Sequence, residues 1–313
     1  MKTQVKTLAG WALTAASLFL LTSCFEDMDV VQRVDEEFAG IQVIEIESGF
    51  LEVNYQGIEG MQEVKLIGQL ESSRGDRFKI DYTTEGDRLR IELDQKSGFG
   101  TGRNRGYLYL TGPKNMKLQI KGGSGEIKVL GIDHPVLEVS IGSGKIELAD
   151  ILSSEIHTEV GSGSFSANSI AGNLQGSACS GELKIQNMEG NVELVASSGK
   201  IDLSNIEGSV NAEMSSGRVH MDGVQELQTI KISSGTVDAQ RVGLGPKTYL
   251  SGSSGNFRIQ TFSDLNAFNF DLKAGSGKVE VGNRGSSGSL LIDHGSPYTV
   301  FGQVSSGNIE IKN

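Results

Sequence analysis

The chain has 313 residues, a formal net charge of −11 and only two cysteines, Cys24 and Cys179. An acidic chain without a basic run is unsuited to nucleic acid, so we exclude that class of partner. If Cys24 carries lipid, Cys179 has no other cysteine to pair with. The fold would then have no disulfide framework.

The first residues have the pattern of a lipoprotein signal peptide. Lys2 and Lys6 precede an apolar stretch of 14 residues, 8–21, which is too short for a comfortable membrane span. The stretch ends in Leu21-Thr22-Ser23-Cys24, which resembles the bacterial lipobox. We therefore expect residues 1–23 to be removed and Cys24 to be lipidated, giving a membrane partner. The alternative is an ordinary signal peptide with a coincidental cysteine.

The segment after the lipidation site is acidic. Residues 25–37 contain six acidic residues, so we interpret 24–37 as a lipidated tether. Glu26, Asp27 and Asp29 resemble an export signal that sends lipoproteins to the cell surface, and a merely solvated linker is the alternative. The expected location is the outer membrane at the cell surface, with the periplasmic face as the alternative.

A repeat of 18 to 22 residues dominates the rest of the chain. Its unit is a Ser-Gly pair followed by alternating polar and apolar residues. The repeat glycines are Gly125, Gly144, Gly163, Gly181, Gly199, Gly217, Gly235, Gly255 and Gly277, and the unit returns at Gly307. The second and fourth residues after each of the ten glycines are apolar, from Ile127 and Val129 to Ile309 and Ile311. Such alternation predicts a strand with its even positions in a core. The period predicts an all-β, single-stranded parallel β-helix (β-solenoid) with about 18–20 residues per coil.

Two further patterns support this register. A second apolar strand recurs in each coil, for example at Val210, Ala212 and Met214. Outward charges of neighbouring coils would also alternate in sign, as in Glu126 beside Lys145, Lys128 beside Glu147, and the series Asp238, Arg258 and Glu280.

Both ends of the repeat are less regular. Gly106 lies 19 residues before Gly125 and Gly49 lies 76 before it, which predicts one solenoid of roughly 14 coils, capped by Phe38 to Val53. Near the carboxyl end, Leu290 and Ile292 would form the second strand of a coil, and Asp293 to Gln303 an inserted loop. The last strand, ending at Asn313, would leave unpaired backbone groups, which suggests an end-to-end homo-oligomer.

One outward patch differs from the charge columns. If Gly106 is in register, Tyr107 and Tyr109 point outward beside a glycine-rich loop that carries Arg103 and Arg105. Exposed tyrosines beside arginines suit contact with a glycan or another surface ligand. The alternative is that this irregular coil packs beneath the cap.

No constellation indicates catalysis, so we expect no enzyme, no metal and no cofactor. The histidines are widely spaced, and no pair has metal-ligand spacing. Asp293-His294-Gly295 echoes a polygalacturonase motif whose partner motifs are absent. Cys179 stands where other coils have glycine or serine, so we expect a buried small residue there.

Two stretches resemble a known family. They are Leu110 to Ile120 running into Gly122 to Ile127, and Phe38 to Val43 followed by Gly49 to Val53. With the Ser-Gly coils, they resemble the putative auto-transporter adhesin family with a head GIN domain, over roughly residues 38–313. The resemblance implies a right-handed β-helix, commonly a lipoprotein of Bacteroides-like bacteria, and brings no catalytic residues. We therefore expect a surface-exposed, lipid-anchored adhesin or ligand-binding scaffold. A periplasm-facing structural lipoprotein and a polysaccharide-acting β-helix enzyme are the alternatives.

Overall fold

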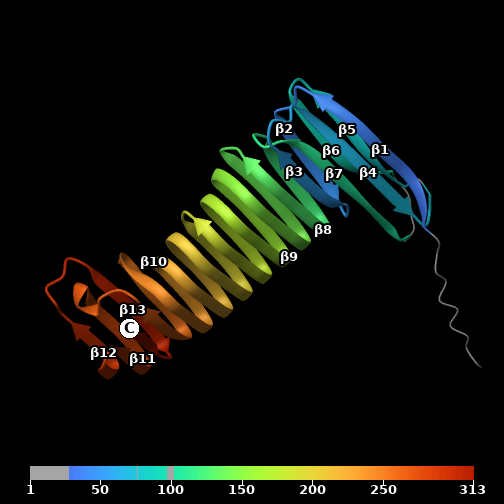
Figure 1. Cartoon of the computed structure of the whole chain (residues 1–313). Coiled ribbons are helices and arrows are strands. Elements are labelled where there is room, and N and C mark those ends of the chain that lie inside the picture. The colour runs from blue at the N-terminus through green and yellow to red at the C-terminus, as the bar shows by residue number, and fades with distance from the viewer. Residues whose placement is uncertain (1–27, 76, 97–101) are drawn as a thin grey trace, which may run out of the picture.

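The computed structural model describes residues 28–75, 77–96 and 102–313, so the signal peptide and Cys24 lie outside the described residues. Almost all of this chain is strand, and the coils stack in one file between an amino-terminal cap and the carboxyl end (Figure 1). The elements are β1 (Asp29–Ala39), β2 (Val43–Gly49), β3 (Glu52–Ile58), β4 (Glu63–Ser72), β5 (Phe78–Glu85), β6 (Arg88–Gln95), β7 (Asn104–Pro113), β8 (Lys117–Asp133), β9 (Val136–Glu189), β10 (Val192–Thr261), η1 (Leu265–Ala267), β11 (Asn269–Val281), β12 (Arg284–Ile292), β13 (Thr299–Ser306) and β14 (Ile309–Lys312). The predicted β-solenoid is confirmed.

The regular coils run from β8 to β10 and pair in parallel, one repeat apart. Gly125 lies beside Gly144, and Gly181 lies beside Gly199. All twenty apolar residues at the second and fourth positions after the repeat glycines are buried, as predicted. The second-strand residues Val210, Ala212 and Met214 are buried as well, so both strands of each coil line one continuous core.

The repeat glycines stand where backbones of successive coils come closest. Gly199 has φ 123°, and a Cβ there would lie 1.9 Å from the carbonyl oxygen of Gly181. Gly199 therefore requires both a positive φ and the absence of a side chain, two demands that glycine alone meets, and the same holds at Gly144, Gly163, Gly181, Gly217, Gly235, Gly277 and Gly307.

A second corner follows six residues after the repeat glycine and was not anticipated from the sequence. Asp150, Ser169, Asn187, Asn205 and Arg241 have positive φ there, between 51° and 58°. Asparagine tolerates this conformation, and the side chains also stack, because Asn205 Nδ2 donates to Asn187 Oδ1 over 2.9 Å. The next residue of each coil, such as Ile151 or Ile206, is buried. Each coil thus turns an additional corner between its two main strands.

The amino-terminal coils are not stacked in chain order. The coil of β2 and β3 lies directly on β8, where Val53 pairs with Ile127, and it separates β8 from β6 and β7. Leu108 is buried as predicted, but it pairs with Val53 and not with the coil of Gly125. The prediction of one uniform stack of about 14 coils is therefore wrong at this end.

A cap of antiparallel strands closes the core at this end. β4 pairs antiparallel with β7 and β1, and β5 pairs antiparallel with β6. A Cβ at Gly106 would lie 2.4 Å from the Gln69 carbonyl oxygen of β4, so this glycine serves the close approach of β4. The cap strands are therefore β1, β4 and β5, whereas β2 and β3, expected in the cap, form a coil.

The acidic tether predicted for 24–37 becomes strand β1 from Asp29 onward. Gln32 fixes this strand to β5, because its Nε2 donates to the Ile80 carbonyl over 2.8 Å and its Oε1 accepts from the Ile80 N–H over 2.7 Å. Val34 is buried against the core. The acidic side chains of β1 face solvent, and composition alone does not show such pairing.

The strands at the carboxyl end are also stacked out of chain order. β13 and β14 form the last coil of the chain, yet they lie between the coil of Gly255 and β11: Ile311 pairs with Ile259 on one side and with Val281 on the other. The predicted free edge at the last strand is therefore absent, and an end-to-end homo-oligomer has no unpaired strand to use there. β12 returns antiparallel along β11 as a hairpin, not as a coil strand, and Thr299 to Gln303 of the expected loop are part of β13.

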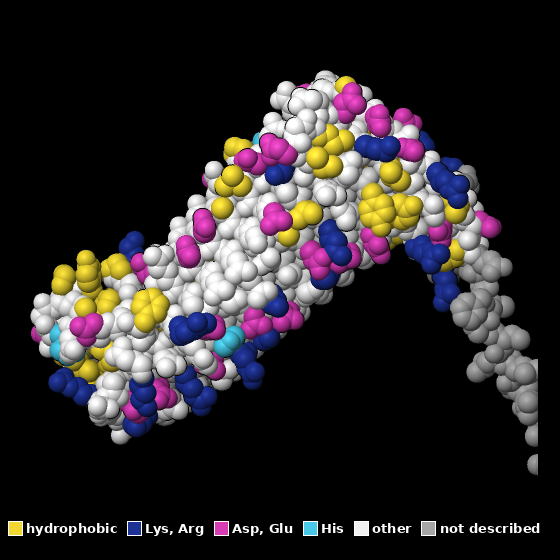
Figure 2. All heavy atoms as spheres, viewed as in Figure 1, with side chains coloured by type: hydrophobic (Ala, Val, Ile, Leu, Met, Phe, Trp, Pro, Cys, Tyr) yellow, Lys and Arg dark blue, Asp and Glu magenta, His cyan; other side chains and the backbone are white. Residues whose placement is uncertain are grey.

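The charged columns mostly follow the predicted register. Lys145 lies 3.4 Å from Glu126, and Lys128 lies 3.2 Å from Glu147. The series Asp238, Arg258, Glu280 is wrong, because Glu310 of β14 lies between the last two. Figure 2 shows both signs of charge distributed along the solenoid, with apolar groups gathered at the cap and at the opposite end.

We predict that Glu147→Gln weakens the fold in a pH-dependent way. Ion pairs with Lys145 and Lys128 lower the pKa of Glu147, so its stabilising contribution is complete above the unfolded pKa and is lost as pH falls through the folded pKa. The pairs are solvent-exposed, so the expected loss of unfolding free energy at pH 7 is roughly 0.2–1 kcal/mol. Urea unfolding at pH 7 and at about pH 3 should show the gap closing. Glu207→Gln, an exposed glutamate with no ion pair in the described chain, is the control; an equal gap at both pH values would contradict the prediction.

We also predict that Gly199→Ala destabilises the solenoid far more than Gly60→Ala. Both glycines have positive φ, but a Cβ at Gly60 meets nothing within 4 Å, whereas at Gly199 it meets the backbone of the adjacent coil. The expected losses of unfolding free energy are about 3 kcal/mol or more for Gly199→Ala and roughly 1–2 kcal/mol for Gly60→Ala. Urea denaturation measures both, and similar losses would show that coil contact does not set the requirement.

Candidate functional site

The two tyrosines predicted to face outward do so. Leu108 and Leu110 of β7 are buried, and Tyr107 and Tyr109 lie on the opposite face with ring centroids 4.6 Å apart in a stacked arrangement. Tyr109 is 47% exposed and pairs across the sheet with Ile67 of β4, which is also exposed. The pair forms a small apolar patch on the outer face of the cap region.

The arginines predicted to accompany them are not equivalent. Arg105 Nε donates to Glu71 Oε2 over 2.6 Å, and this bond is the main cause that lowers the pKa of Glu71. The backbone N–H of Arg103 donates to Ser73 Oγ over 3.0 Å, and Arg103 is exposed. Arg105 is therefore paired with Glu71 of β4 although its side chain is exposed, so Arg103 and the tyrosine pair are the part of this predicted site without such a partner among the described residues.

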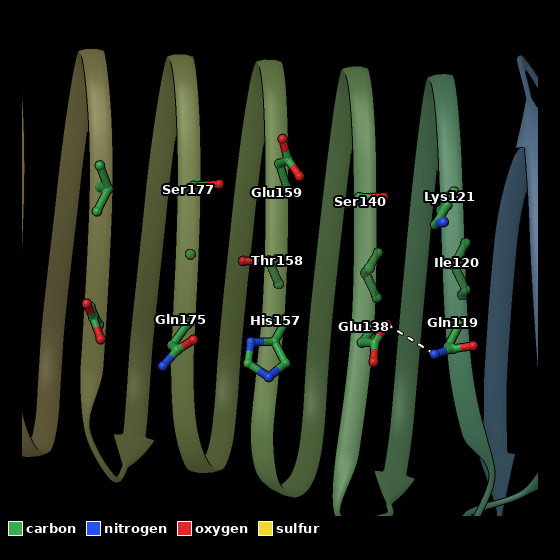
Figure 3. Close-up of a pocket in the computed structure, with 14 residues that line it drawn as sticks. Gln119, Ile120, Lys121, Glu138, Ser140, His157, Thr158, Glu159, Gln175 and Ser177 are labelled. Atoms are coloured by element: carbon green, nitrogen blue, oxygen red, sulfur yellow. Dashed lines mark hydrogen bonds between the residues drawn. The ribbon is translucent and has the colours of Figure 1, made fainter.

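A larger hollow lies on the outer face of the second strand of each coil, and we call it the trough. Its volume is about 600 Å³. One row of its side chains follows the solenoid axis through five coils: Gln119, Glu138, His157, Gln175 and Glu193. A second row runs beside the first: Lys121, Ser140, Glu159, Ser177 and Val195. Figure 3 shows the two rows on successive coils.

The hollow results from the small residues in its rows and floor. Gly176 and Thr158 stand at inward positions between the two rows, and Ser140 and Ser177 are short members of the second row. Longer side chains at Glu138 and Glu193 rise beside them. With a coil spacing of about 4.8 Å, the first row is about 19 Å long.

The first row of the trough is polar throughout, whereas Val195 and the inward residues Ile120 and Val139 add apolar surface, and the trough carries more negative than positive charge. Glu138, Glu159 and Glu193 contribute three carboxylates against the single ammonium of Lys121. Gln119 Nε2 donates to Glu138 Oε2 over 3.1 Å, and His157 Nε2 lies 3.6 Å from Glu155 Oε2 outside the trough. Amides, carboxylates and hydroxyls at regular spacing can exchange hydrogen bonds with a polar ligand that repeats along the same axis.

The trough was not identified from the sequence, although a signal existed. The outward positions of the second strand could be tabulated by the same period as the core positions. Their small members, such as Ser140 and Ser177, would have marked the low part of the face. The depth of the hollow depends on how the coils stack, which the period alone does not give.

Three other residues considered from the sequence are Asp293, His294 and Cys179. His294 Nδ1 lies 2.8 Å from the Phe268 carbonyl oxygen, and Asp293 Oδ1 accepts from the Gly295 N–H over 2.8 Å, so both hold the turn before β13. Cys179 is exposed, which contradicts the expected buried position; its neighbour Ala178 is the buried residue of this turn.

The family of the chain follows from the same coils. Residues 41–312 match one family model, described as Toastrack DUF4097. The chain belongs to the Toastrack DUF4097 family. The match covers the solenoid with its swapped coils and the cap strands β4 and β5, but not β1. The head GIN relationship suggested by Leu110 to Ile127 stays a prediction. No curated protein matches the chain.

Several solved structures resemble this Toastrack chain at low sequence identity. A "putative cell adhesion protein" from Clostridium sporogenes is 15% identical, with a TM-score of 0.29, and covers 90% of this chain and 99% of its own. A "putative adhesin" from Bacteroides fragilis is 9% identical, with a TM-score of 0.32, and covers 90% and 97%. A "putative lipid binding protein" from Parabacteroides distasonis is 11% identical, with a TM-score of 0.27 and the same coverage.

The described residues contain no helix of the length and apolar character needed to cross a membrane. They also contain no group of three or more histidine, cysteine, aspartate or glutamate side chains arranged to hold a metal ion.

Proposed function

We propose that the chain is a lipid-anchored protein of the outer membrane that is exposed at the cell surface and binds a glycan in the trough without catalysing a reaction. The observation that carries the proposal is the regular double row of side chains along the solenoid axis, which is polar at every position except Val195. The lipobox at Cys24 and the acidic residues after it support the anchored, surface location.

The dimensions and chemistry of the trough favour an extended, uncharged or cationic glycan. Successive coils offer a hydrogen-bonding group at each step of about 4.8 Å, a spacing close to the length of one sugar unit in an extended chain. Three carboxylates against one ammonium disfavour a polyanion. The floor of the trough combines Ile120 and Val139 with the smaller Thr158 and Gly176, so it offers apolar surface to the face of a sugar ring. The tyrosine pair of Tyr107 and Tyr109 lies on a separate part of the surface and is a second contact for such a ligand.

The same geometry supports binding in preference to hydrolysis. Glycoside hydrolysis requires two carboxyl groups converging on one bond. The trough glutamates Glu138, Glu159 and Glu193 instead belong to three different coils, and Glu159 lies in the other row from Glu138 and Glu193. Carboxylates spread along the solenoid axis in this way suit a repeating ligand.

We predict that Ser177→Trp abolishes glycan binding without unfolding the protein. The indole would fill the trough, while the half-buried outward position of Ser177 tolerates a larger side chain. Binding of purified protein to a panel of immobilised neutral and amino-sugar glycans, followed by calorimetry on the best ligand, should show at least a tenfold loss. Ser166→Trp, which changes a half-buried outward serine on the first-strand face of the same coil, is the control. Absence of any ligand on the panel, or equal losses in both variants, would overturn the proposal.

We predict that protease applied to intact cells digests the protein while a periplasmic control survives. Cys24→Ala should release the chain from the membrane fraction, because it removes the residue to which the lipid attaches. Protection of the wild-type chain until the outer membrane is broken would overturn the surface location and favour a periplasm-facing structural lipoprotein. Retention of Cys24→Ala in the membrane would overturn the lipid anchor.

A further inference from the structure

A second hollow lies on a different face, over the first strands of the coils that begin at Gly199, Gly217, Gly235 and Gly255. We call it the basic cleft, and its volume is about 490 Å³. Its charged lining consists of Lys200, Arg218, Arg258, His220, Asp202 and Asp238. Thr236 and Asn256 add uncharged polar groups.

The two arginines of the basic cleft form no ion pair within the described chain, although Asp238 and Glu310 flank Arg258 in its column. Lys200 is paired, because it contacts Asp202 and lies 3.4 Å from Glu182. Arg218 and Arg258 are exposed, and neither has an ion pair among the described residues. By contrast, Arg241 one corner away forms two hydrogen bonds with Asp222, of 2.7 and 2.6 Å. The cleft thus keeps two guanidinium groups available in a chain whose net charge is −11.

The register places the two arginines on either side of a coil whose outward side chains are short. Arg218 is the first residue after Gly217, and Arg258 is the third after Gly255. Thr236 and Asp238 occupy the coil between them and have shorter side chains. Asn256 Oδ1 accepts from the Asn308 N–H and side chain, which leaves the NH₂ group of Asn256 to donate. A ligand above Thr236 would therefore lie between two guanidinium forks and near further donors.

We infer that the basic cleft binds a sulfate or phosphate ester group, with Arg218 and Arg258 as the principal ligands. A guanidinium fork donates two parallel hydrogen bonds to a tetrahedral oxyanion, which an ammonium group cannot do. Lys200 is already paired with Asp202 and Glu182, and Glu310 lies beside Arg258, so the two unpaired guanidinium forks, and not the net charge of the cleft, favour the anion. The site is independent of the trough, which lies on a different face.

Asp238 limits the strength of this site and provides a sharp test of it. Its carboxylate lies in the same outward column as His220 and Arg258, beneath the proposed position of the anion. Replacement by the isosteric amide removes the repulsion and adds a donor. Asp238→Asn should therefore tighten anion binding, whereas removal of either arginine should weaken it.

The test uses the full mature chain, a sulfated oligosaccharide and, separately, vesicles containing a phosphate-headgroup lipid. We expect the oligosaccharide to bind, Arg218→Ala and Arg258→Ala each to weaken binding at least tenfold, and Asp238→Asn to strengthen it severalfold. Arg284→Ala, which removes an exposed arginine on β12 outside the cleft, should leave affinity within twofold, and all four variants should keep the wild-type melting temperature. Vesicle binding with the same dependence would identify the ester as a lipid headgroup.

Three results would overturn the inference: no binding of either probe, equal losses in Arg284→Ala and the cleft variants, or unchanged affinity in Asp238→Asn. None of them bears on the trough, since Ser177→Trp tests that site with uncharged and amino-sugar ligands.

Discussion

The closest contact between coils, the approach of one glycine backbone to the next, sets the rest of the structure. At Gly181 and Gly199 no side chain fits between the two backbones, so the coils pair at strand spacing along their whole circumference. This pairing brings the apolar second and fourth positions into one core. It also aligns the outward positions into straight columns, and the trough and the basic cleft are both made of such columns. Both the trough and the basic cleft therefore depend on the close approach of the glycine backbones at this corner.

The alternation of polar and apolar residues was sufficient to predict most of the regular part of the fold. The alternation after each repeat glycine predicted twenty buried residues from Ile127 to Ile311, because side-chain direction in a strand depends only on position. The order of the coils could not be predicted in this way. The spacing placed Leu51, the second residue after Gly49, in register with Leu108 and Ile127, but Val53 takes this place. Nothing in the segments of Val53 and Leu108 indicates which of them lies against Ile127. Long-range choices between equivalent strands are decided by the connecting segments and by the cap.

The candidate sites were harder to predict than the core for a related reason. Core positions are restricted to apolar residues, whereas an outward position accepts almost any polar residue, so Ser177 or Thr236 carries little signal alone. Their meaning comes from neighbours one and two coils away. The tyrosine pair could be found because aromatic side chains are unusual at outward positions. Its predicted partner Arg105 could not be evaluated without Glu71, which is 34 residues away in the sequence.

The exchanged order of the terminal coils affects how the stack comes apart. A solenoid built in strict chain order can fray from its ends, one repeat at a time. Here the coil of β2 and β3 is covered by β6 and β7, and the coil of β13 and β14 is covered by β11. Neither of these two coils can leave the stack before the strands that cover it have separated. The two exchanges therefore restrict fraying of the stack, and β14 completes an interior layer of it.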